Sequence, residues 1–166
     1  MVFLIIVIVL AIIFFVVAKN MNNGGNYSLI AKMITTYYVA IEDNPKGKAL
    51  GLREKLYFAA LLDTAVYIQS GRIALDKLES AVDVSYRPDE VHKSLVNLCI
   101  TVEILIFRED SNFSMEEIAQ AVMSKKDTIS YTVSQTLANA KYNEEYSVVK
   151  AAVDRFFEDD EYLDLL

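Results

Sequence analysis

A chain of 166 residues, 54% of them hydrophobic, is long enough for one folded domain with its own core and too apolar to be disordered. Its formal net charge of −7 disfavours nucleic acid or an anionic lipid surface as the main partner, because both require a basic face. The hydrophobic pattern predicts an all-α protein: an N-terminal transmembrane helix followed by a compact bundle or short solenoid of stacked helical hairpins.

The first segment, residues 2–18, is an unbroken apolar run that reads VFLIIVIVLAIIFFVVA. A helix of this length spans roughly 25 Å, which is close to the ~30 Å hydrocarbon core of a bilayer. Inside lipid each peptide group must be hydrogen-bonded within the segment, which favours a helix. Residues 1–19 are therefore predicted to form a transmembrane anchor that contacts membrane lipid through residues 2–18.

Export is the alternative interpretation of the same run, with signal cleavage near Ala18. A retained anchor explains the run better, because a signal peptide carries a basic region before a shorter apolar core and only Met1 precedes this one. Lys19 and Lys32 follow the run. By the positive-inside rule they predict a single-pass protein with its N-terminus outside and the following domain in the cytoplasm.

Residues 20–27 contain Gly24-Gly25 and are predicted to be a flexible linker, which leaves residues 28–166 as the all-α cytoplasmic domain. Within this domain, apolar residues recur at helical spacing. The predicted helices cover about residues 28–41, 52–70, 73–84, 88–108, 114–122, 128–140 and 144–157. Pro88 suits the first turn of a helix. Ser70-Gly71 suits a helix C-terminus in which the glycine adopts the left-handed conformation, and Ser114 with Glu117 suits a capping box.

Residues 63–82 and 103–122 align at an offset of forty, with acids matched at Asp63 and Glu103 and small residues at Ala81 and Ala121. Such spacing is typical of helical hairpins stacked side by side. Two amphipathic helix pairs of similar length can also align by chance, because they share the same apolar period. If the repeat is real, Ala81 and Ala121 occupy equivalent helix crossings.

The sequence shows no catalytic, cofactor-binding or metal-binding constellation, so it predicts a protein that is not an enzyme and needs no cofactor. His92, the only histidine, has no second His or Cys at metal-ligand spacing and is predicted to be a plain surface residue. Cys99, the only cysteine, permits no intramolecular disulfide and is predicted to be a buried thiol. The acids Asp63 and Glu103 are interpreted as parts of solvated faces.

Residues 117–133 resemble the helix-turn-helix of DNA-binding proteins, with Ala119 where its two helices would cross. Met123 stands where the motif usually has glycine. Lys125 and Lys126 offer the only phosphate contacts, and acidic residues surround them, so nucleic acid is not the expected partner.

The last residues mix acids with large apolar side chains. If this segment is unstructured, Tyr162, Leu163, Leu165 and Leu166 could bind a groove of a protein partner. The alternative is a final helix packed on the domain, because Phe156, Leu163 and Leu166 can share one helical face.

These features together predict a membrane-anchored helical interaction or scaffold protein, an adaptor that holds a protein partner at the cytoplasmic membrane face. The alternative is a membrane-tethered helix-turn-helix transcription regulator.

Overall fold

The computed structural model describes residues 27–166, and all regular structure in this range is helical, as predicted. The elements are α2 (Tyr27–Glu42), α3 (Pro45–Lys48), α4 (Leu52–Gln69), α5 (Leu75–Ser85), α6 (Val91–Asp110), α7 (Met115–Met123), α8 (Lys126–Asn139), η1 (Ala140–Tyr142), α9 (Glu144–Phe156) and η2 (Asp160–Leu165). From residue 27 onward, none of the helices has the length and hydropathy needed to cross a bilayer. The predicted anchor, residues 1–19, lies outside the described residues.

The observed helix ends show which local sequence signals correctly predicted where a helix begins or ends. Ser114 and Glu117 form the predicted capping box at the start of α7, and Gly71 adopts the predicted left-handed conformation after α4, with φ at 70°. The prediction that Pro88 lies in the first turn of a helix is wrong, because α6 begins only at Val91. The hydroxyl of Ser94 accepts a hydrogen bond from the amide of Arg87 and donates one to its carbonyl, which folds the preceding loop back onto the helix.

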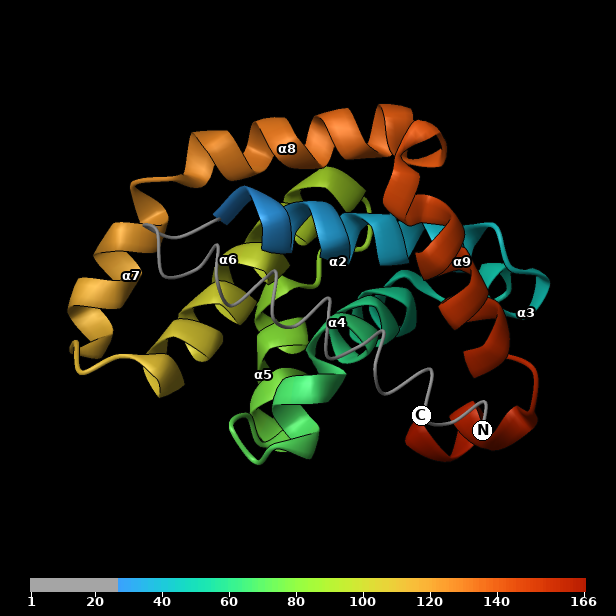
Figure 1. Ribbon diagram of the computed structural model, residues 1–166, viewed down its shortest axis with the longest axis horizontal. Helices are drawn as coiled ribbons and strands as arrows, with labels where there is room; N and C mark the ends of the chain where they lie inside the picture. The colour runs from blue at the N-terminus through green and yellow to red at the C-terminus, as the bar shows by residue number, and fades with distance from the viewer. Residues whose placement is uncertain (1–26) are drawn as a thin grey trace.

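The central helix of the fold is α2, which packs against α4, α6, α8 and α9 (Figure 1). Four helices can approach it because several of its buried residues are small, Ala31 and Ala40 among them. Its larger buried residues, such as Ile34 and Ile41, fill the space between its neighbours. The core therefore surrounds α2, while α7 and α9 lie at opposite ends of the molecule (Figure 1).

Helices α4 to α7 follow the order expected of two hairpins, since α5 packs between α4 and α6 and α7 packs on α6. The second helices begin at Leu75 and Met115, which keeps the offset of forty. The environments differ, however. Ala81 is buried at 2% exposure, whereas Ala121 is exposed, so the expectation that Ala121 lies at an equivalent helix crossing is wrong. The reason is that two helices cover α5, whereas α7 lies at the edge of the described domain and packs on α6.

This difference predicts unequal effects of added bulk. Ala81→Leu should lower the free energy of unfolding by about 1–3 kcal/mol, because it overpacks a filled contact. Ala121→Leu should change it by less than about 0.5 kcal/mol, as expected at an exposed position. Urea unfolding of the full chain in mild detergent measures both. Equal destabilisation by the two variants would contradict the edge position of α7.

Candidate functional site

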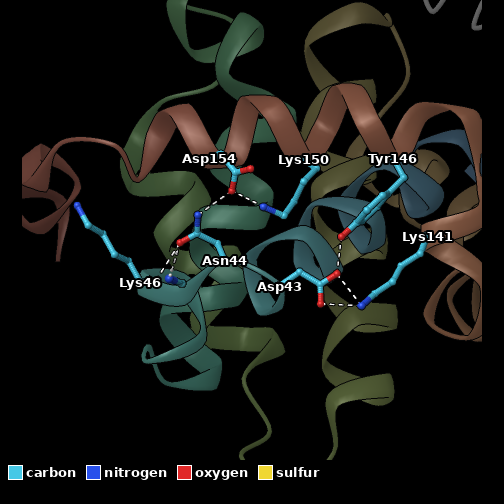
Figure 2. A network of polar contacts seen from close by, with 8 residues as sticks. Asp43, Asn44, Lys46, Lys141, Tyr146, Lys150 and Asp154 are labelled. Carbon is cyan, nitrogen blue, oxygen red and sulfur yellow. Dashed lines mark hydrogen bonds and ion pairs between the residues drawn. The ribbon is translucent and has the colours of Figure 1, made fainter.

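A polar network fastens the carboxy-terminal helices to the turn between α2 and α3 (Figure 2). Asp43 accepts a hydrogen bond from the ammonium group of Lys141 at 2.8 Å and another from the hydroxyl of Tyr146. Burial of Asp43 would raise the pKa of its carboxyl, but the hydrogen bonds from Lys141 and Tyr146 hold this pKa below its usual value. Asp43 is therefore charged at neutral pH and holds η1 and α9 against the end of α2.

Asn44 extends this network on both sides. Its side-chain oxygen accepts hydrogen bonds from the amides of Lys46 and Gly47, which caps α3, while its amide nitrogen donates to Asp154 of α9 at 2.8 Å (Figure 2). Lys46 then donates to Asp160 at 2.8 Å, at the start of η2. The network thus fixes where the last residues of the chain lie.

The carboxy-terminal segment is folded as η2, so the expectation of a packed ending fits better than an unstructured one. Tyr162 is 8% exposed, and its ring centroid lies 4.7 Å from that of Phe157 and 6.1 Å from that of Phe58. The packing is carried by Tyr162 and not by the leucines that were expected to share a helical face with Phe156.

Of the four residues predicted to bind a partner, Tyr162 is buried and the three leucines are on the surface. Leu163 is 52% exposed, Leu165 41% and Leu166 59%. Leu165 and Leu166 also line a small cavity of about 90 Å³, whose other walls are formed by α4 and α5. The structure therefore presents the leucines on a short helical segment that Tyr162 anchors in the core.

Of the two acidic residues that were expected on solvated faces, Glu103 lies in the interior and Asp63 is half-buried. Glu103 on α6 is fully buried, and neither of its carboxyl oxygens has a hydrogen-bond partner among the residues that the structure describes. Burial, and secondarily the nearby charge of Asp63 on α4, raise the pKa of Glu103 to about 9. Burial alone raises the pKa of the half-buried Asp63 to about 7. Glu103 is therefore an uncharged carboxylic acid at neutral pH.

The surroundings of this pair hold further titratable groups. Burial, with the charges of Glu103 and Asp63, raises the pKa of the Cys99 thiol, so the predicted buried thiol is inert as a nucleophile. Burial and Asp63 also raise the pKa of Tyr37. Between residues 27 and 166, no three His, Cys, Asp or Glu side chains are grouped so that they could hold a metal ion. Within the described part of the chain, this arrangement shows no nucleophile and base in contact.

The segment that resembles a helix-turn-helix does form two helices, α7 and α8, separated by Ser124 and Lys125. Both pack on α6, and Ile118, Val122 and Ile129 are buried as the motif requires. His92 does not behave as a plain surface residue. It is half-buried, and its Nε2 lies 2.9 Å from the hydroxyl of Ser134 and 3.2 Å from the carbonyl of Ser130, both on α8.

Comparison with known proteins gives no relative from which a function can be transferred. No protein-family model, no curated protein and no solved structure matches the chain. The function must therefore be argued from the residues and their arrangement.

Proposed function

We propose that this protein is a membrane-anchored scaffold, which holds a protein partner at the cytoplasmic membrane face through its carboxy-terminal leucines. The observation that carries the proposal is the contrast in exposure among the side chains of η2 and of Leu166, which follows it directly. Tyr162 is buried, whereas Leu163, Leu165 and Leu166 expose about half of their side-chain surface. Burying them in a partner would contribute on the order of 1 kcal/mol each, because apolar surface is removed from water at about 25 cal/mol per Å².

The fixed position of these leucines supports a binding role. The ring contacts of Tyr162 and the ion pair between Lys46 and Asp160 order η2 before any partner arrives. An ordered segment loses less conformational entropy on binding than a disordered one does. The leucines can therefore bind without a folding step.

The charges around the leucines indicate what kind of partner fits. The exposed residues of this segment include the acids Glu158, Asp159, Asp160, Glu161 and Asp164. A complementary protein surface has an apolar groove for the leucines and basic side chains around its rim. The same acids disfavour an anionic lipid surface as the occupant.

The apolar run at residues 2–18 supports the proposed membrane anchor. Lys19 and Lys32 follow this run, so the positive-inside rule favours a cytoplasmic domain. A stacked arrangement of hairpins, with α4 to α7 as its two pairs, would give such a scaffold further edges for assembly. The exposed edge at α7 is one of them.

Co-purification from detergent-solubilised membranes tests the leucine surface. A chain with Leu163→Ser, Leu165→Ser and Leu166→Ser should lose at least nine-tenths of the partner that the wild-type chain retains, because the apolar contact is removed. The matched control replaces three exposed apolar residues elsewhere, Val84, Phe113 and Tyr131, with serine and should keep the partner. Equal retention by both triple variants would refute the role of η2.

A membrane-tethered transcription regulator is the second candidate function. It is favoured by the two-residue connection between α7 and α8 and by their shared packing on α6. The balance of charge favours the scaffold over the regulator. Glu116, Glu117 and Asp127 are exposed beside Lys125 and Lys126, so α7 and the start of α8 present no extended basic face along which a DNA backbone could lie.

A further inference from the structure

A cleft of about 540 Å³ lies between the loop before α6, the first turns of α6 and the start of α8. Its size is that of a site for a small organic molecule. Arg87 comes from the loop, Lys93 from α6 and Lys126 from α8, so three separate elements bring cations to one concave surface. The cleft is thus rich in positive charge, whereas the chain as a whole has a net charge of −7.

Two of these cations have no carboxylate partner. Lys93 pairs with Glu90 at 2.6 Å, and among residues 27–166 Glu90 is the only acid that lines the cleft. Arg87 and Lys126 take part in no ion pair anywhere in the described part of the chain. A bound anion can therefore pair with both of them without breaking an existing contact.

Uncharged groups complete the lining. Asn97 and Ser130 supply hydrogen-bond donors, and Val96 supplies an apolar wall. His92 also lines the cleft, and its Nε2 lies within hydrogen-bond distance of the Ser130 carbonyl and the Ser134 hydroxyl, so it links α6 to α8 at this point. These contacts join α6 and α8, the two helices that contribute most of the cleft's lining.

We propose that this cleft binds a small organic molecule that carries a phosphate monoester. The two unpaired cations call for a ligand with about two negative charges, and a phosphate monoester carries about −1.5 to −2 at neutral pH. The guanidinium of Arg87 can bind two phosphate oxygens at once, while the ammonium of Lys126 acts as a point charge. Lys126 is also the first residue of α8, whose dipole adds positive potential at that end. The site is independent of the leucine surface and of the proposed scaffold function.

The single histidine provides a specific reporter, since its ring protons give one set of imidazole signals in an NMR spectrum of the full chain in detergent. Titration with phenyl phosphate should shift these signals in a saturable way. Benzenesulfonate, which has the same ring and one negative charge, should bind at least tenfold more weakly. Arg87→Gln and Lys126→Gln should each weaken phenyl phosphate about tenfold, because each removes a charge-assisted hydrogen bond.

Lys48→Gln is the matched control, because Lys48 is an exposed lysine that lies outside the cleft and forms no ion pair with any described residue. It should bind phenyl phosphate as the wild type does. The proposal is overturned if the His92 signals do not move, or if Arg87→Gln and Lys126→Gln bind as tightly as Lys48→Gln. It is also overturned, in favour of the DNA-binding alternative, if a short DNA duplex shifts these signals and phenyl phosphate does not.

Discussion

Raising the pH from about 5 to about 9 should destabilise the protein progressively, because Glu103 is buried as a neutral acid. Its pKa is about 9 in the folded protein, against an ordinary value of 4.5. Below pH 4.5 both the folded and the unfolded chain hold this proton, and the stabilisation is fully present. Above it, only the folded chain holds the proton, so Glu103 by itself lowers the free energy of unfolding by up to about 1.4 kcal/mol per pH unit until the pH passes about 9.

Glu103→Gln should remove most of this dependence, because glutamine has a similar shape and does not ionise. A smaller slope below pH 7 should remain from Asp63, whose pKa of about 7 acts in the same direction. Urea unfolding at pH 5, 6, 7, 8 and 9 gives the comparison, with Glu116→Gln on the exposed face of α7 as control. An equal fall for wild type and Glu103→Gln would show that this carboxyl is not held neutral.

Phe58→Ala should be the most damaging single truncation of the core, at a cost of about 3–5 kcal/mol. Phe58 is fully buried, and its ring centroid lies 5.2 Å from that of Phe156 and 6.1 Å from that of Tyr162. Removing the ring leaves a cavity and also frees Tyr162, so η2 should detach. Tyr162 fluorescence is not separable from that of the other tyrosines, so the measurement is urea unfolding together with proteolysis of the last residues.

Tyr142→Ala is the control for this variant, since Tyr142 is 88% exposed and its removal should cost less than about 0.5 kcal/mol. If Phe58→Ala lowered the free energy of unfolding by less than about 1 kcal/mol, the ring contacts of Phe58 with Phe156 and Tyr162 would not be central to the stability of the domain. Preserved resistance to proteolysis after residue 157 would contradict its role in holding η2.

Most of the helices could be predicted because their signals are local. Apolar spacing located α2 and α4 to α9, and the capping residues Ser114 and Glu117 fixed the start of α7. The short helix α3 was not among the predicted helices, since Pro45 and Gly47 are poor helix residues. It forms because Asn44 caps its first turn. Glycine is needed at residue 47, because a Cβ atom there would come within 2.5 Å of the carbonyl oxygen of Ile41.

The candidate site was harder to predict, because burial depends on which helices become neighbours. Glu103 follows Cys99 by four residues and precedes Ile106 by three, so its place on the buried face of α6 could have been recognised from the spacing. The cleft beside His92 could not, because Arg87 and Lys126 are brought together only by the packing of α8 on α6. Likewise, the sequence gives no reason for Tyr162 to be buried and its neighbouring leucines exposed.

Thiol labelling of the linker tests the membrane-anchored account most directly. The wild-type chain supplies the blank, because its only cysteine, Cys99, is fully buried. With Asn23→Cys in the predicted linker, or Lys77→Cys on the exposed face of α5, an impermeant thiol reagent should label nothing in intact cells. Both cysteines should be labelled after permeabilisation, and the protein should sediment with membranes. Labelling in intact cells, or a mature chain that begins at Lys19, would contradict a retained anchor with a cytoplasmic domain.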